Sequence, residues 1–95
     1  MISYIKGEIL EVGFLSKQVY VIVFVNGVGY QVFVPAGDTY DVGKEVSLFT
    51  SFQVREDSQN LYGFLKKEQK EMFESVLNVS GVGPKVALAI VSTFS

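Results

Sequence analysis

The feature that most constrains this fold is a pair of apolar runs joined by Asn26-Gly27. This dipeptide between two apolar segments is the strongest short-range signal for a two-residue β-hairpin. The first run covers Gln18–Val25, and the second covers Val28–Val34 and stops at Pro35. The sequence therefore predicts two antiparallel strands here.

Three further strands are expected around this hairpin. Residues 2–12 are rich in apolar and β-branched residues, and Gly7 in their middle indicates a bulge or a bend. Residues 45–54 read as a fourth strand, residues 55–60 as a polar turn and residues 61–65 as a short fifth strand. Five short antiparallel strands predict a closed barrel of the OB type, because closure removes exposed strand edges. A meander or an open sheet is the alternative.

The second strand is apolar on both of its faces. A strand in a small monomeric barrel normally alternates between apolar residues facing the core and polar residues facing water. An apolar outer face indicates self-association, and the alternative is that helices C-terminal to the barrel cover it. The residues predicted for this oligomer interface are Val19, Val21, Val23 and Val25.

The hydrophobic period becomes helical after residue 65. The apolar stripe of the first helix consists of Met72, Phe73, Val76 and Leu77. No Ser or Thr precedes this helix to cap it, so the sequence does not fix its first residue. Pro84 suits the first position of a second helix, where its missing N–H costs nothing. The apolar stripe of that helix consists of Val86, Ala87, Ile90, Val91 and Phe94.

These patterns predict a mainly β protein with appended helices. A five-stranded OB-type antiparallel barrel is expected at residues 1–64, and a helix-hairpin-helix at residues 65–95. Helical periodicity continues to the end of the chain, which predicts a piece of a longer protein.

Composition narrows the classes of function. The 95 residues include no cysteine and no histidine, so neither disulfides nor a Cys/His zinc site is expected. No nucleophile has a base beside it, so we expect no cofactor, no metal and no enzymatic activity. Without a signal peptide or a membrane-spanning run, the chain is expected to be cytoplasmic. The net charge of −2 is unusual for a nucleic-acid binder, but four lysines fall in the last third: Lys66, Lys67, Lys70 and Lys85.

The segment richest in functional information is the predicted hairpin between the helices. Gly81 and Gly83 allow backbone conformations closed to other residues and leave no side chain between the backbone and a ligand. The first N–H groups of the following helix lack internal partners and lie at the positive end of its dipole. With Lys85 beside them, these groups predict a phosphate site.

Other interpretations of this hairpin are weaker or equal. A nucleotide P-loop needs Gly-Lys-Ser/Thr, but here Lys85 follows proline and precedes Val86. A dinucleotide fingerprint needs a small residue at position 86 and a preceding strand. A plain helix–helix turn is as compatible with the glycine spacing as a phosphate site, and only the lysine favours the phosphate site.

Three segments resemble one known family. The segment Val79-Ser-Gly-Val-Gly-Pro-Lys85 resembles the helix-hairpin-helix motif. Together with Asn26-Gly-Val-Gly-Tyr-Gln-Val-Phe-Val-Pro35 and Val54-Arg-Glu-Asp57 followed by Leu61-Tyr-Gly-Phe64, it resembles the RuvA family of bacterial Holliday junction branch-migration proteins. The resemblance runs from residue 1 to residue 95.

The resemblance implies a sequence-independent, structure-specific DNA-binding subunit without catalytic activity. Such a subunit holds four-way junctions during ATP-driven branch migration in homologous recombination, DNA repair and the SOS response. It implies a homotetramer or an octamer, a RuvB-type ATPase motor bound through a further C-terminal region, and a RuvC-type nuclease as another partner. The alternatives are a generic single-strand-binding OB module, with Tyr4, Tyr30 and Tyr62 stacking on bases, or a structural oligomerisation domain.

The resemblance also implies roles for individual residues. Glu56 and Asp57 match an acidic pin at the centre of the junction, and Arg55 beside them is a further DNA contact. The DNA phosphates would be bound by the backbone N–H groups of Gly81, Val82 and Gly83 and by the charge of Lys85.

Overall fold

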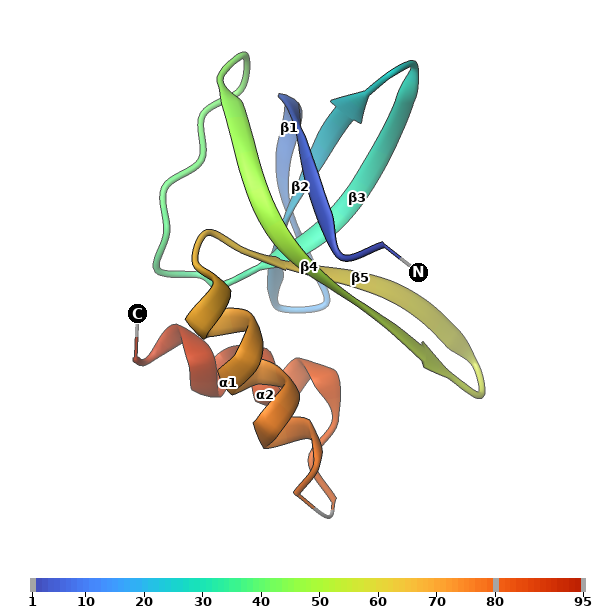
Figure 1. The fold of residues 1–95 in the computed structure, drawn as a ribbon, viewed down its shortest axis with the longest axis vertical. Coiled ribbons are helices and arrows are strands. Elements are labelled where there is room, and N and C mark those ends of the chain that lie inside the picture. The colour runs from blue at the N-terminus through green and yellow to red at the C-terminus, as the bar shows by residue number, and fades with distance from the viewer. Residues whose placement is uncertain (1, 80, 95) are drawn as a thin grey trace.

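The computed structural model describes residues 2–79 and 81–94, which form five strands followed by two helices (Figure 1). The strands close into a barrel in the order β1-β2-β3-β5-β4. The predicted mainly β fold, an OB-type barrel with appended helices, is confirmed. The elements are β1 (Tyr4–Leu15), β2 (Gln18–Val25), β3 (Val28–Val34), β4 (Glu45–Arg55), β5 (Ser58–Phe64), α1 (Lys67–Leu77) and α2 (Pro84–Ser92).

One detail of the predicted barrel is wrong, because its strands are not all antiparallel. Strands β3 and β5 pair in parallel, with Val32 opposite Leu61 and Phe33 opposite Tyr62. The other four pairs are antiparallel. A ring with an odd number of strands cannot alternate direction throughout, so one parallel pair is required for closure.

Strand β1 bends so that it can pair with β4 at its start and with β2 further along. Glu8 lies opposite both Glu45 and Phe24 at this change of partner. A Cβ at the neighbouring Gly7 would lie 2.2 Å from the carbonyl oxygen of Phe24, so only glycine fits there. The bulge itself lies between Ile9 and Glu11, a few residues beyond the predicted position.

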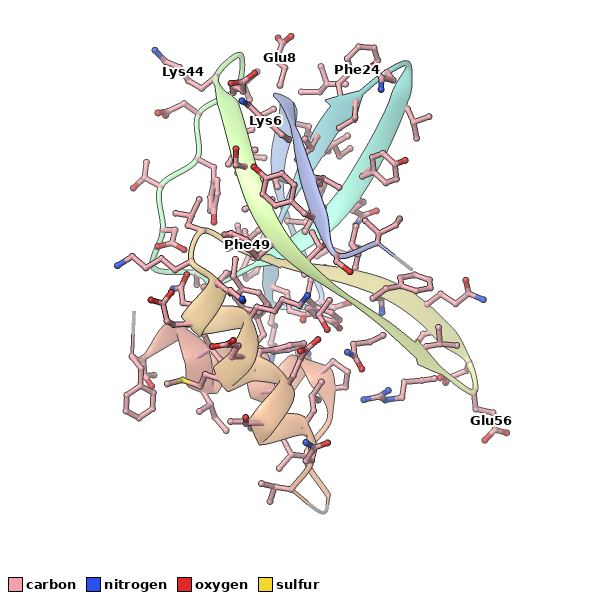
Figure 2. All side chains as sticks on the ribbon, in the orientation of Figure 1. Lys6, Glu8, Phe24, Lys44, Phe49 and Glu56 are labelled. Carbon is pink, nitrogen blue, oxygen red and sulfur yellow. The ribbon has the colours of Figure 1, made fainter. Side chains whose placement is uncertain are left out.

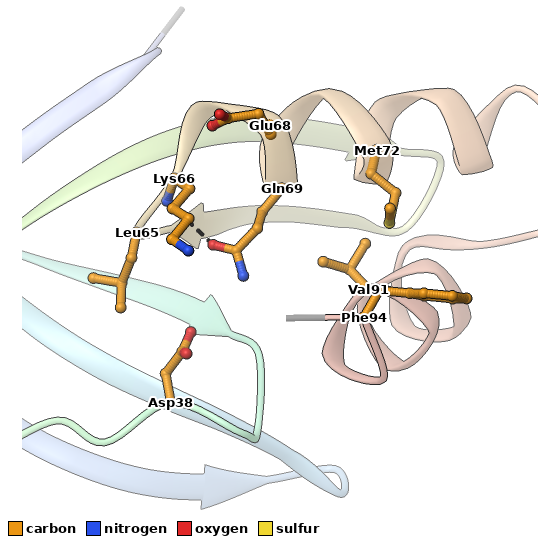
Figure 3. Close-up of a pocket in the computed structure, with 8 residues that line it drawn as sticks. All are labelled: Asp38, Leu65, Lys66, Glu68, Gln69, Met72, Val91 and Phe94. Carbon is orange, nitrogen blue, oxygen red and sulfur yellow. Dashed lines mark hydrogen bonds between the residues drawn. The ribbon is translucent and has the colours of Figure 1, made fainter.

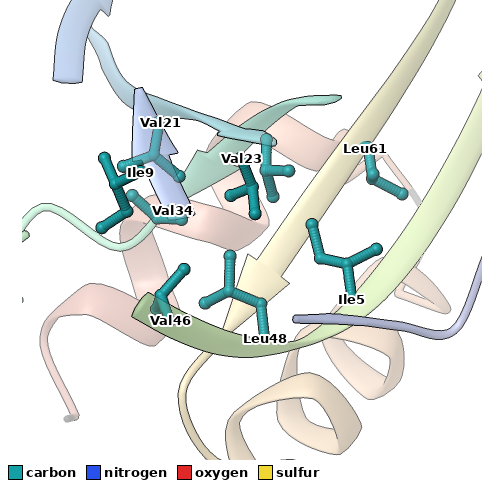
Figure 4. Packing of buried hydrophobic residues seen from close by; sticks show 9 residues of the cluster. Ile5, Ile9, Val21, Val23, Val34, Val46, Leu48 and Leu61 are labelled. Carbon is teal, nitrogen blue, oxygen red and sulfur yellow. The ribbon is translucent and has the colours of Figure 1, made fainter. Parts of the chain in front are cut away.

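The barrel interior is filled by aliphatic side chains that alternate along the strands (Figure 4). Several of them, including Val21, Val23 and Leu48, are completely buried. Close packing of such side chains is the main source of stability in a barrel of this size. The buried cluster consists of Ile5, Ile9, Val21, Val23, Val32, Val34, Val46, Leu48 and Leu61.

A second cluster fastens the helices to the outside of the barrel. The ring of Phe73 on α1 lies 5.1 Å from the rings of both Tyr62 and Phe64 on β5. Ser51 of β4 donates a 2.8 Å hydrogen bond to Oε2 of Glu74 on α1. The two helices are thereby held at a fixed place relative to the barrel. The cluster consists of Phe33, Tyr62, Phe64, Phe73, Ala87, Leu88 and Val91.

The buried face of α2 overlaps the predicted apolar stripe at Ala87 and Val91 but is rotated from it. Ala87, Leu88 and Val91 are buried, whereas Val86 and Phe94 are exposed. Because α2 carries apolar residues around most of its circumference, its periodicity does not determine which side faces the barrel.

Helix α1 begins without a Ser or Thr cap. The backbone N–H of Lys66 donates instead to Oε1 of Gln69, at 3.1 Å (Figure 3). This turn borders a groove of about 340 Å³ between the loop after β3 and the two helices. The groove is lined by side chains of both charges, Asp38 and Glu68 against Lys66, so it has no clear preference for an anion. Neither described helix is long and apolar enough to cross a membrane.

Candidate nucleic-acid interface

The two glycines between α1 and α2 have different conformations. Gly81 has a φ of +82°, in the left-handed region that favours glycine. Gly83 has φ −94° and ψ 172°, an extended conformation that any residue adopts, and it is the N-cap of α2. No described atom lies within 4 Å of a Cβ built on either glycine, so this backbone is open to solvent. Ser80 of the same motif lies outside the described residues.

Val82, between these glycines, anchors the connection. Its N–H donates to the carbonyl oxygen of Val79 at 3.2 Å. Its side chain is half-buried against the cluster that joins the helices to the barrel. A local turn therefore already uses the N–H group that was predicted to donate to DNA, and that role of Val82 stays a prediction.

The open donors lie one step further along the chain. The first backbone hydrogen bond of α2 runs from the N–H of Ala87 to the carbonyl of Gly83, at 3.0 Å. The N–H groups of Gly83, Lys85 and Val86 come before it and have no hydrogen-bond partner within the described part of the chain. They lie at the positive end of the helix dipole, and the first turn of α2 carries no acidic residue. Val86 is absent from the predicted site residues because its apolar side chain gives no signal about its backbone N–H.

Lys85 adds a cation to this end of α2. Its side chain is exposed. The one ion pair among the described residues joins Lys6 to Glu45, at 3.7 Å, so Lys85 has no carboxylate partner there. The structure thus combines open backbone donors with an unpaired lysine, which is the arrangement that binds phosphate oxygens at a helix N-terminus.

The predicted acidic residues form the turn between β4 and β5. Glu56 and Asp57 are both exposed, and Arg55 pairs with Ser58 at the base of the turn. Figure 2 shows the Glu56 side chain extending beyond the tip of this turn. The guanidinium of Arg55 donates to the carbonyl of Val54 at 3.3 Å, and neither carboxylate has an ion-pair partner in the described chain. The tip therefore presents uncompensated negative charge.

The hairpin and the acidic turn lie toward the same end of the molecule. Figure 1 places the connection of α1 to α2 and the β4–β5 turn in the lower half of the view. The β2–β3 turn lies at the opposite end of the longest axis. One ligand of sufficient size can therefore contact the hairpin and the acidic turn together.

The tyrosines do not form a base-stacking platform. Tyr62 is buried against Phe33 and Phe73, and this burial raises the pKa of its phenol against the opposing effects of Asn60 and Arg55. Tyr30 is half-buried against the barrel core, and only Tyr4 of the three is exposed. Among the described residues, no three His, Cys, Asp or Glu side chains are grouped so that they could hold a metal ion.

The predicted oligomer interface is out of register by one residue. Val21 and Val23 are completely buried inside the barrel, and Val19 and Val25 are half-buried against the same core. Because neighbouring residues of a strand face opposite ways, the outer face of β2 carries the residues between these valines. An apolar interface on this strand would therefore use Tyr20, Ile22 and Phe24.

The outer face of β2 is covered at one end and exposed at the other. Tyr20 packs against the helix cluster, with its ring 6.5 Å from that of Phe33. Ile22 is half-buried, and Phe24 at the far end keeps 42% of its surface exposed. The cluster that fastens the helices to the barrel covers Tyr20 at one end of the face, and Phe24 at the other end is exposed.

Fold and site together define a small OB-type barrel protein with two appended helices joined by an exposed glycine hairpin. Comparison with known proteins makes the assignment specific. The family model described as the RuvA N terminal domain matches residues 1–63, and the chain belongs to the RuvA family.

Three relatives carry the name Holliday junction branch migration complex subunit RuvA. The protein from Francisella tularensis subsp. novicida is 44% identical over 95 residues, which cover 97% of this chain and 42% of that protein. The Natranaerobius thermophilus protein is 44% identical over 98% of this chain and 43% of its own length. The Desulforamulus reducens protein is 48% identical over 97% of this chain and 45% of its own length. The chain thus spans less than half the length of these relatives.

Proposed function

We propose that this chain is the junction-holding part of a RuvA-type subunit. It binds four-way DNA junctions by their shape, without reading sequence, so that a separate motor can drive branch migration in recombination and repair. The names of its relatives and 44% to 48% identity support this function. The observation that carries it is the exposed hairpin, where backbone donors and Lys85 have no partner among the described residues, on the same end of the molecule as the acidic β4–β5 turn.

The hairpin supplies the attraction for DNA. The N–H groups of Gly83, Lys85 and Val86 donate to backbone phosphate oxygens, and the ammonium group of Lys85 neutralises charge. The open backbone at Gly81 and Gly83 lets a phosphate approach closely. Contacts of this kind position DNA and are independent of its sequence.

The acidic turn supplies selectivity for the junction. Glu56 and Asp57 repel phosphates, so continuous duplex lying across the turn is disfavoured. An open junction centre has room for the turn between its arms. Arg55, at the base of the turn, contacts a neighbouring backbone.

Assembly places several hairpins around one junction. The open end of the β2 outer face, at Ile22 and Phe24, is apolar and supports a homotetramer or an octamer of two tetramers. The subunit acts in the cytoplasm without catalysis of its own. A RuvB-type motor supplies ATP hydrolysis and a RuvC-type nuclease cuts the strands.

Titration of the chain with fluorescent DNA tests this function. A four-way junction, a duplex of the same sequence and a single strand are compared at several salt concentrations. The junction is expected to bind most tightly, with affinity that falls steeply with salt. Equal affinity for all three, or preference for the single strand, would contradict the proposal.

Matched lysine variants connect the binding to the hairpin. Lys85→Ala is expected to weaken binding to the junction. Lys44→Ala changes the net charge equally at the opposite end of the molecule (Figure 2) and is expected to leave binding unchanged. Equal losses in the two variants would indicate a general charge effect instead of a defined site.

A further inference from the structure

Two turns of the barrel have a similar backbone but very different sequences. In the β2–β3 turn, Asn26 and Gly27 have φ values of +48° and +84°. In the β1–β2 turn, Ser16 and Lys17 have φ values of +53° and +64°. Two consecutive positive φ angles favour Asn-Gly and disfavour a long side chain such as lysine. The β1–β2 turn therefore holds its lysine in a strained conformation, and strain of this kind often marks a functional position.

The strained lysine lies beside the hairpin site. Lys17 and Lys85 line one groove of about 360 Å³, between the β1–β2 turn and α2. The two lysines are far apart in sequence, and neither has an ion-pair partner within residues 2–79 and 81–94. No acidic residue lines the groove. The other lining residues are Gln18, Val19, Val34, Ala36, Leu88, Ala89 and Ser92.

The wall of this groove contains an unsatisfied polar group. Oε1 of Gln18 is buried and has no hydrogen-bond partner in the described chain. A buried polar atom without a partner is unfavourable, which gives this side chain a reason to reorient when the groove is occupied.

We propose that this groove is a second phosphate site, which binds a DNA backbone phosphate next to the one at the hairpin. Lys17 and Lys85, which line the groove from two elements, supply the charge. OB barrels commonly contact nucleic acid through the β1–β2 and β4–β5 turns. In this barrel the β4–β5 turn is acidic and repels phosphates, so the β1–β2 turn is the one that can attract DNA. The inference rests on the proposed function, because it assumes that DNA is the ligand.

Repair of the strained turn separates this role from a structural one. Ser16→Asn combined with Lys17→Gly installs the favoured turn sequence and removes the charge. We expect a higher melting temperature together with several-fold weaker binding to the junction. Lys17→Gln should weaken binding to a similar extent, and each variant should lower the dependence of log affinity on log salt by about one. A turn with only a structural role would gain stability and bind DNA as before.

The parent, Lys85→Ala and Lys44→Ala are titrated in parallel with junction and duplex. If Lys85→Ala weakens binding and both Lys17 variants bind like the parent, the second site is overturned and the proposed function stands. If the parent shows no preference for the junction, the proposed function fails. The second phosphate site is then tested by the affinities of the variants for duplex DNA. If the parent and the Lys17 variants then bind duplex with equal affinity, the second phosphate site is overturned. If the Lys17 variants bind duplex more weakly than the parent, the second phosphate site is supported. Absence of binding to any DNA overturns both.

Discussion

The barrel interior and the connection between α1 and α2 use the same kinds of groups in opposite ways. In the barrel, backbone N–H groups pair across strands and alternate side chains fill a closed core. In the connection, the N–H groups of Gly83, Lys85 and Val86 have no partner in the described chain, and the glycines leave the backbone bare. The first region supplies stability and the second is proposed to supply binding, so substitutions in the two regions should have separable effects.

The largest expected effect is on the stability of the barrel. Leu48→Ala removes a completely buried side chain and leaves a cavity, which should lower the free energy of unfolding by about 2–5 kcal/mol. Urea denaturation followed by circular dichroism measures the change. Leu10→Ala, at a position 47% exposed, is the control and should cost much less. Equal costs would show that the barrel core does not carry the stability.

Substitutions at the two glycines of the connection should separate an effect on stability from an effect on DNA binding. Gly81→Ala forces a side chain into a left-handed conformation and should cost about 1–2 kcal/mol of unfolding free energy. Gly83→Ala has an ordinary φ and open space, so stability should not change while junction binding weakens. Thermal melts and DNA titrations of both variants make the test. Unchanged DNA binding by Gly83→Ala would contradict close approach of a phosphate.

Removal of the hairpin cation should affect binding without affecting the fold. Lys85→Ala is expected to bind the junction about tenfold more weakly at low salt, which corresponds to about 1.4 kcal/mol. The slope of log affinity against log salt concentration should fall by about one, as expected for the loss of one phosphate contact. Because the side chain is exposed, the melting temperature should stay within a degree or two of the parent, about what a surface substitution causes. A large drop in stability would assign Lys85 a structural role.

The smallest expected effect concerns selectivity. Glu56→Gln with Asp57→Asn removes two uncompensated charges from an exposed turn. Repulsion between unit charges at about 4 Å in water is about 1 kcal/mol, so the ratio of junction to duplex affinity should fall about fivefold. The fall should come from tighter duplex binding. An unchanged ratio would contradict the proposal that the acidic turn supplies selectivity for the junction.

The same comparison explains which features the sequence could predict. Asn26-Gly27 and the strand pattern were sufficient for the barrel, because turn chemistry and periodicity are local signals. The inward face of β2 was assigned incorrectly, since a strand without polar residues carries no alternation that distinguishes its faces. The buried face of α2 was predicted only in part, at Ala87 and Val91, for the same reason.

Features that depend on three-dimensional packing were out of reach. The engagement of Val82 by Val79 and the closeness of Lys17 to Lys85 arise from the folded arrangement. The turn at Ser16 and Lys17 has none of the residues that usually signal positive φ angles. Division of the chain into units at residues 1–64 and 65–95 stays a prediction, as do the roles of the individual site residues.

The most direct test follows the backbone amides of a ¹⁵N-labelled chain by NMR during titration with a short-armed four-way junction. The resonances of Gly83, Lys85 and Val86 should shift strongly as their N–H groups bind phosphate, while those near Phe24 at the opposite end stay in place. Unchanged hairpin resonances, with shifts confined to the barrel, would contradict the claim that the helix start is where DNA docks.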